Sequence, residues 1–265
     1  MKKLFIKFIA IVIAVVFLIP ILYTILYSFL DPGSGGHFSI QQYVNISMDK
    51  VEIFKTLLNS IIIVGCIIVG QLIVSCFTAY YFAFNSRKFS KCMFIVYIFI
   101  MLLPLQITLI PNVILFNSIE KMYNIKLFDN YITIILPGIF NTLGVFFLKQ
   151  YFDSIPKKYI EMAKIDGASN FQIFTKVVLP NSKYAILAVC LVIFIDNWNL
   201  IEQPLIFIDS VSKMPASIYL NTLYDMDKSI FYAASIVFMF PVLFLILKNI
   251  NNIKSFISQG KRGKM

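Results

Sequence analysis

Six long apolar runs constrain the fold of this chain more than any other feature of its sequence. Apolar residues make up 59% of its 265 positions and charged residues 14%, whereas ordinary globular domains have about 45–50% and about 25%. A helix needs roughly 20 apolar residues to cross a bilayer core of about 30 Å. Strands of a membrane barrel alternate over about ten residues and do not fit runs this long. We therefore predict an all-α membrane protein with six spans, at Leu4–Leu30, Leu57–Phe84, Cys92–Phe116, Tyr131–Leu148, Ala185–Ile208 and Ile230–Leu247.

The distribution of Lys and Arg predicts which side of the membrane each loop occupies. Basic residues concentrate near the cytoplasmic ends of spans. With the N-terminus placed inside, all but six of the 23 Lys and Arg residues fall in cytoplasmic segments, the six being Lys50, Lys55, Lys121, Lys126, Lys213 and Lys228. Both termini are therefore predicted to be cytoplasmic. Topology and contact with the anionic lipid of the bilayer explain the net charge of +10, so we predict no nucleic-acid partner.

The sequence contains no catalytic or metal-binding pattern. It has no phosphate-binding loop of the Gly-x-x-x-x-Gly-Lys-Ser/Thr type, no nucleophile elbow and no pair of histidines. The four cysteines lack metal-ligand spacing, and the single histidine, His37, is interpreted as a solvated surface residue. We predict a chain that is not an enzyme and binds no cofactor itself, so that any energy for driven work comes from another polypeptide.

The charged loop 153–182, between the fourth and fifth runs, is predicted to form two short helices. The first opens at Ile155-Pro156 with Ser154 as its cap and stops at Gly167, a residue suited to the left-handed conformation. Along it, four residues at helical spacing share one face: Tyr159, Met162, Ala163 and Asp166.

The second helix of this loop begins with Ser169 and Gln172 in a capping-box pattern and runs to Leu179-Pro180. Two helices joined by a glycine turn make a thin hairpin that suits docking into a groove of a soluble partner. The alternative is an amphipathic hairpin that lies in the lipid interface.

Four motifs along the chain occur in a fixed order and spacing. In the loop, Glu161, Ala163, Asp166, Gly167 and Ala168 stand as Glu-x-Ala-x-x-Asp-Gly-Ala, followed by Leu179-Pro180. The other motifs are Leu102-Leu103-Pro104-Leu105-Gln106 with Ile110-Pro111, Leu148-Lys149-Gln150-Tyr151-Phe152 with Ile155-Pro156, and Trp198-Asn199 with Pro204-Leu205. Together they resemble the permease subunits of ATP-binding-cassette (ABC) importers, in particular the carbohydrate-uptake branch of the maltose-transporter type. The resemblance covers roughly residues 50–250.

The resemblance implies a type I ABC importer permease fold in a bacterial-type cell membrane. It implies three partners: a second, different permease subunit, a cytoplasmic ATPase dimer that carries ATP and Mg, and an external solute-binding protein. The loop hairpin would insert into the ATPase, which would drive alternating access of the spans. The residues that the resemblance assigns to ATPase coupling are Tyr159, Glu161, Met162, Ala163, Asp166, Gly167, Ala168, Leu179 and Pro180.

The fifth run is unusually polar, which predicts a substrate path. An ionisable group inside a span costs roughly 2.5–3.5 kcal/mol and tends to face water. Asp196, Asn199 and Gln203 are predicted to share one helix face, with Glu202 near it. Such groups, with an indole ring, suit sugar hydroxyls and ring faces, so a sugar or oligosaccharide is the expected cargo. The predicted path residues are Gln106, Asn141, Asp196, Trp198, Asn199, Glu202 and Gln203.

Several alternatives stay open at this stage. In one alternative the polar groups of the fifth run bond to the paired subunit or cap a broken helix near Pro204, and for Glu202 bonding between helices or subunits is the favoured interpretation. In a second alternative the cargo is an amino acid, a peptide or another small solute. In a third the chain as a whole is an ATP-independent secondary transporter or a membrane scaffold. We divide it into residues 1–55 (first span and external loop), 56–250 (permease core) and 251–265 (basic cytoplasmic tail).

Overall fold

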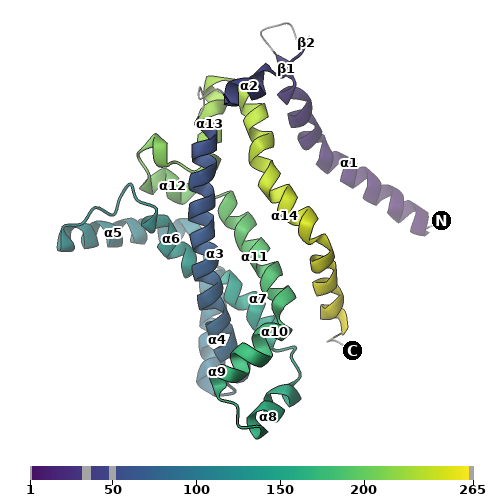
Figure 1. Cartoon of the computed structure of the whole chain (residues 1–265), viewed down its shortest axis with the longest axis vertical. Helices are drawn as coiled ribbons and strands as arrows, with labels where there is room; N and C mark the ends of the chain where they lie inside the picture. Colours follow the sequence, from purple (N-terminus) through teal and green to yellow (C-terminus); the bar gives the residue numbers. More distant parts are fainter. Residues whose placement is uncertain (1, 32–36, 48–51, 263–265) are drawn as a thin grey trace.

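Helices form most of the chain in the computed structural model, which describes residues 2–31, 37–47 and 52–262 (Figure 1). Two short strands, β1 (Leu30–Asp31) and β2 (His37–Phe38), pair antiparallel. A π-helical turn (Phe174–Val178) and a 3-10 turn (Val211–Lys213) interrupt the later segments. The α-helices are α1 (Lys2–Ser28), α2 (Gln41–Ser47), α3 (Ile53–Phe84), α4 (Lys88–Met101), α5 (Leu105–Tyr123), α6 (Ile132–Ile139), α7 (Leu143–Phe152), α8 (Lys157–Ile165), α9 (Asn170–Ile173), α10 (Leu179–Asn181), α11 (Lys183–Trp198), α12 (Glu202–Phe207), α13 (Ala216–Met226) and α14 (Lys228–Arg262).

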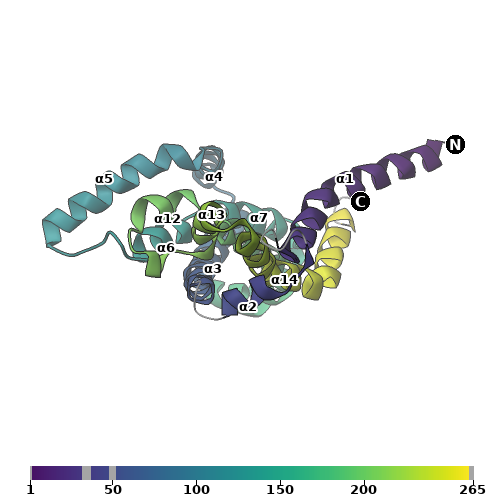
Figure 2. The same cartoon turned by 90° about the horizontal axis from the view of Figure 1, so that it is seen from above.

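The long helix α3 is the axis around which the other helices pack. It contacts α6, α7, α11 and α13, and Ile67, Leu148 and Ile193 are among the buried side chains of the shared core. Its closest neighbour is α7, where a Cβ on Gly144 would lie 2.5 Å from Ser75 Oγ. Only glycine allows the two helices to approach so closely. Seen from above, α5 and α1 extend from this core in opposite directions (Figure 2).

Several of the predicted spans are confirmed as helices that are long and apolar enough to cross a membrane. The first run corresponds to α1, the second to α3 and the sixth to α14, and α6 with α7 makes a fourth candidate over Ile132–Phe152. Two further pairs of helices pass the same test only together: α4 with α5, and Asn170–Asn181 with α11. By length and composition the described residues therefore contain four spans, or six if each bent pair counts as one.

The third and fifth predicted spans are each broken in the structure, the fifth as in the alternative of a broken helix near Pro204. Helices α4 and α5 meet at an angle of 95°, because Pro104 lacks the N–H that a continuing helix requires and restricts the residue before it. In the fifth run α11 ends at Trp198 and α12 starts at Glu202. At this break side chains replace backbone N–H groups as donors. The side-chain amide of Asn199 donates to the carbonyl of Ile195 at 2.8 Å, and the hydroxyl of Ser217 donates to the carbonyl of Leu200 at 2.6 Å.

A buried carboxylate joins the loops before α6 and after α12. The ammonium of Lys213 lies 2.8 Å from Asp129 Oδ2, and Ser210 donates from its N–H to Oδ1 at 3.0 Å and from its hydroxyl to Oδ2 at 2.8 Å. The hydrogen bond from Lys213, followed by those from Ser210, holds the pKa of the Asp129 carboxyl well below its usual range. These contacts connect two loops far apart in the sequence, on the side predicted to be external.

Asp129→Asn is expected to lower the thermal midpoint of the solubilised protein at neutral pH. Because the folded-state pKa lies below the unfolded value of about 3.9, the carboxylate stabilises the fold above that value and loses this effect as the pH falls toward the folded pKa. Asn tolerates the left-handed backbone of this position, where φ is 58°, so the substitution tests the charge. Midpoints of variant and wild type should differ at pH ~7, and the difference should shrink only as the pH falls below ~3.9 toward the folded-state pKa. Equal midpoints at neutral pH, or an equal loss in the exposed control Asp225→Asn, would contradict this role.

Candidate functional site

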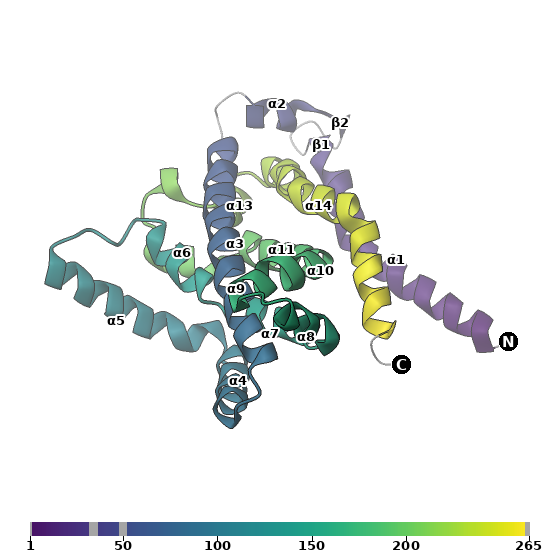
Figure 3. The same ribbon diagram turned by 60° about the horizontal axis from the view of Figure 1, so that its bottom comes forward.

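The predicted hairpin is present and lies at one end of the molecule. Helices α8, α9 and α10 lie toward the lower end in Figure 1 and come forward together near the centre of Figure 3. Gly167 has φ +79°, and its N–H donates to Lys164 O while the N–H of Ala168 donates to Ala163 O, both at 3.0 Å. This pattern of two bonds around a left-handed glycine ends α8 rigidly. The capping box of Ser169 and Gln172 starts α9 as predicted.

One detail of the predicted hairpin is wrong. Helix α8 begins at Lys157 after Pro156, and no side chain caps it. The hydroxyl of Ser154 instead donates to the carbonyl of Tyr151 at 2.6 Å, one turn earlier. Ser154 therefore closes the end of α7 and does not start α8.

Helix α8 is anchored on one side and bare on the other. Ile160 is buried, and Ala163 and Ala168 pack against the main core. On the outer side Tyr159 and Met162 are exposed, and Ile165 has 86% of its surface exposed. Exposed apolar side chains on a charged helix are typical of a surface that a partner covers. Ile165 was not among the predicted coupling residues, although its place beside Asp166 was a usable signal.

The remaining predicted coupling residues occupy two positions on the hairpin. The carboxylates of Glu161 and Asp166 are exposed and make no ion pair within the described ranges of the chain. Leu179 and Pro180 lie at the base of the hairpin in α10, where Leu179 packs against the core and Pro180 is exposed. The hairpin therefore offers free carboxylates near its tip and apolar packing at its base.

Breaks in three helical segments meet at a polar hollow. The α4–α5, α6–α7 and α11–α12 breaks all contribute to a cavity of about 430 Å³. Irregular backbone at membrane depth is tolerated where it is buried in protein or lines a water-filled cavity. Its polar lining residues are Thr108, Asn112, Asn141, Thr142, Asp196, Asn197 and Gln203.

A second hollow of about 340 Å³ adjoins the first and shares Asp196 with it. Its other polar lining residues are Gln106, Asn199 and Glu202. The side-chain amide of Gln106 donates to Glu202 Oε1 at 2.7 Å, which ties α5 to α12. Glu202 Oε2 is buried and finds no hydrogen-bond partner in the part of the chain that the structure describes.

The structure brings most of the predicted path residues together but changes how they meet. The prediction that Asp196, Asn199 and Gln203 share one helix face is wrong, because α11 ends before Asn199. They converge instead through the break. Trp198 lines neither hollow: its ring is buried, stacks between Phe194 and Phe238, and donates to the carbonyl of Phe238 at 3.2 Å. We therefore leave Trp198 out of the candidate path.

Sequence reasoning missed four polar residues of the first hollow. Thr108, Asn112 and Thr142 were not singled out, and Asn197 was noted only as a neighbour of Asp196. Each is a polar residue inside or beside an apolar run, which is the signal that identified Asn141. Among the described residues no group of His, Cys, Asp or Glu is placed to hold a metal ion.

Comparison with known proteins assigns the chain to a family. Residues 71–253 match the binding-protein-dependent transport system inner membrane component family, and the chain belongs to this family. A solved bacterial ABC transporter involved in the import of the acidic polysaccharide alginate has a similar fold, with a TM-score of 0.79, 20% identity and coverage of 94% of this chain and 96% of that one. The fold is thus that of an ABC importer permease, as predicted.

Two curated relatives show the range of the similarity. The sn-glycerol-3-phosphate transport system permease protein UgpE of Salmonella choleraesuis is 32% identical over 171 residues, which are 63% of this chain and 57% of that protein. The arabinooligosaccharides transport system permease protein AraQ of Halalkalibacterium halodurans is 28% identical over 192 residues, which are 71% of this chain and 67% of that protein. The chain thus spans 57% of the length of the first of these relatives.

Proposed function

We propose that the chain is one permease subunit of a binding-protein-dependent importer that a separate ATPase drives from the cytoplasm. The observation that carries this proposal is the rigidly capped hairpin, which exposes Ile165, Met162 and two unpaired carboxylates at one end of the bundle. In this proposal the ATPase covers these exposed groups. ATP and Mg belong to the partner ATPase in this scheme, and the chain itself binds no cofactor.

The hairpin is mechanically connected to the polar hollow. Helix α9, the π-helical turn and α10 lead directly into α11, with a bend of 76° between the two parts. Ile173, Phe174 and Val178 bury this connection in the main core. Helix α11 carries Asp196 at its far end. A push on α8 therefore shifts Asp196 and the α11–α12 break, which would open or close the path.

The lining of the two hollows suits a sugar or oligosaccharide. Amides, hydroxyls and carboxylates supply both donors and acceptors for sugar hydroxyls, and Phe140 adds an apolar surface. The named cargoes of the relatives, glycerol 3-phosphate and arabinooligosaccharides, are polyhydroxylated molecules. Since one chain contributes one wall of the path, we propose a second permease subunit opposite it, an external solute-binding protein, and a site in the cell membrane.

Co-purification tests this proposal. The tagged chain, extracted from its own cells in mild detergent, is expected to carry an ABC ATPase and a second multi-span protein. The variant Ile165→Asp, altered only on the exposed face of α8, should lose the ATPase while it keeps the second permease. The proposal would be contradicted if the cells take up the solute normally and the chain purified from them carries neither partner.

A further inference from the structure

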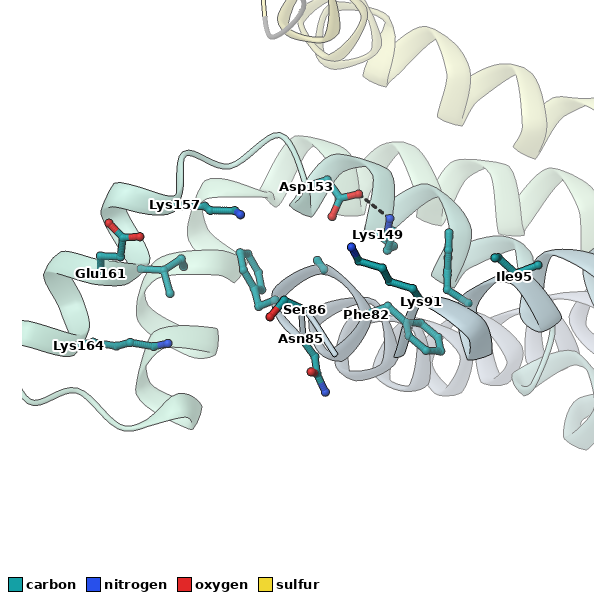
Figure 4. Close-up of a pocket in the computed structure, with 14 residues that line it drawn as sticks. Phe82, Asn85, Ser86, Lys91, Ile95, Lys149, Asp153, Lys157, Glu161 and Lys164 are labelled. Carbon is teal, nitrogen blue, oxygen red and sulfur yellow. Dashed lines mark ion pairs between the residues drawn. The ribbon is translucent and has the colours of Figure 1, made fainter. Parts of the chain in front are cut away.

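A third hollow lies beside the hairpin, between the end of α3, the start of α4, the end of α7 and α8 (Figure 4). Its volume is about 570 Å³, and it is distinct from the polar hollows at the helix breaks. One wall is α8 of the coupling hairpin, but the other walls come from α3, α4 and α7, and the hollow shares no lining residue with the substrate path. On the predicted topology it opens at the cytoplasmic face of the membrane.

Lysines from three helices gather around this hollow. Lys91, Lys149, Lys157 and Lys164 line it, against the two acids Asp153 and Glu161. Lys149 is engaged, because its ammonium lies 2.6 Å from Asp153 Oδ2 and 4.4 Å from the centre of the Phe94 ring.

The other three lysines, Lys91, Lys157 and Lys164, have no acidic partner within the described ranges. Figure 4 shows Lys91 and Lys157 extending from different helices toward the same space. These three ammonium groups face one unpaired carboxylate in the lining, that of Glu161. The excess positive charge favours an anionic ligand, because a negative charge bound between the ammonium groups lowers their mutual repulsion.

Two helix N-termini add to this positive potential. Helix α8 begins at the hollow with Lys157, α4 begins at Lys88 between the lining residues Ser86 and Lys91, and neither start has a side-chain cap. Their first N–H groups are therefore free of side-chain acceptors, and the positive end of each helix dipole favours an anion nearby. Phosphate oxygens are common acceptors in such positions.

The hollow also has an apolar side. Phe82, Phe94 and Ile95 line it, and exposed apolar side chains continue along α4 from Ile95 to Phe99 and Leu102. An acyl chain would bury this apolar surface, whereas a soluble phosphate compound would leave it exposed. We propose that the hollow binds the headgroup phosphate of an anionic phospholipid, with the lysines around the phosphate and the acyl chains along α4. Basic pockets between spans on the cytoplasmic side are known to hold such headgroups.

A bound headgroup would tie α8 to the turn between α3 and α4. Lys157 and Lys164 belong to α8, while Lys91 belongs to α4 and Ser86 to the turn. The lipid would then set the resting position of the coupling hairpin. This consequence rests on the proposed function, whereas the binding site itself does not.

Native mass spectrometry of the purified full-length chain in detergent tests the site. Phosphatidylglycerol is expected to bind at least about tenfold more tightly than phosphatidylcholine, and the double variant Lys91→Gln/Lys157→Gln to lose about tenfold of that affinity. The charge-preserving Lys91→Arg/Lys157→Arg variant should bind like the wild type. So should Lys176→Gln/Lys183→Gln, which removes two cytoplasmic lysines outside the hollow.

Unchanged phosphatidylglycerol binding by the glutamine variant would overturn the proposal, as would full displacement of the lipid by inorganic phosphate. The unaltered chain provides a second measurement that depends on no variant. Photoactivatable phosphatidylglycerol should label peptides that contain residues 82–95 and 157–164, and even labelling of all spans would contradict the site. Neither measurement involves ATPase or transport, so failure of the lipid site is distinguishable from failure of the proposed function.

Discussion

Gly167→Pro is expected to abolish ATP-driven uptake, with transport at least about tenfold below wild type and membrane insertion intact. Proline fixes φ near −65°, whereas Gly167 has φ +79°. It also removes the N–H that donates to Lys164 O at 3.0 Å. The end of α8 then unwinds, and Ile165 and Asp166 no longer present one fixed surface. A loss of about 1.4 kcal/mol in productive docking already costs a factor of about ten. Solute uptake and ATPase co-purification are the measurements.

Gly167→Asn is the matched control. Asn adopts the left-handed conformation more readily than other non-glycine residues, and no atom lies within 4 Å of a Cβ at this position. We therefore expect Gly167→Asn to keep most of the transport. If both variants transport at the wild-type rate, the hairpin does not transmit force.

Asp196→Ala is expected to reduce transport efficiency by about tenfold or more while the ATPase stays bound. Asp196 is the one polar residue that lines both hollows, which otherwise share Leu105 and Leu200. A hydrogen bond to a charged group contributes about 1.5–3 kcal/mol, and each ~1.4 kcal/mol is a factor of about ten. The measurement is the concentration dependence of solute uptake in vesicles that contain the complete complex.

Two further variants separate a path role for Asp196 from a structural one. Asp196→Asn keeps the shape and part of the hydrogen bonding, so it should lie between alanine and wild type. Asp209→Ala removes an exposed carboxylate outside both hollows and should have no effect. Wild-type kinetics for Asp196→Ala would assign this residue to packing between subunits or helices.

The hairpin was predictable from the sequence because its rules are local. A left-handed glycine and a capping box each act within a few residues, so Gly167, Ser169 and Gln172 mark the turn without reference to the rest of the fold. The first, second and sixth spans were predictable for a similar reason, since continuous apolar runs are sufficient for long helices in a membrane.

The breaks in the other spans were not predictable in the same way. Pro104 gave a signal for the α4–α5 break, but the end of α11 depends on where freed carbonyls find new partners, such as Ser217 for Leu200. Trp198 was placed in the path because an indole ring can stack on a sugar ring, but it can equally well stack on another aromatic side chain in the core. In the structure it stacks on Phe238, which is distant in the sequence and gave no local signal. The basic hollow was not predictable, because Lys91 and Lys157 are far apart in the sequence and line the same hollow only in the folded chain.

Reconstitution in vesicles tests the central claim most directly. The purified chain, alone or with the second permease and the ATPase that co-purify with it, is assayed for accumulation of the solute against its gradient, with and without ATP and with the solute-binding protein present. Accumulation is predicted only for the complete complex with ATP, and Gly167→Pro should eliminate it. Uphill movement of the solute by the chain alone, without ATPase or ATP, would contradict the account.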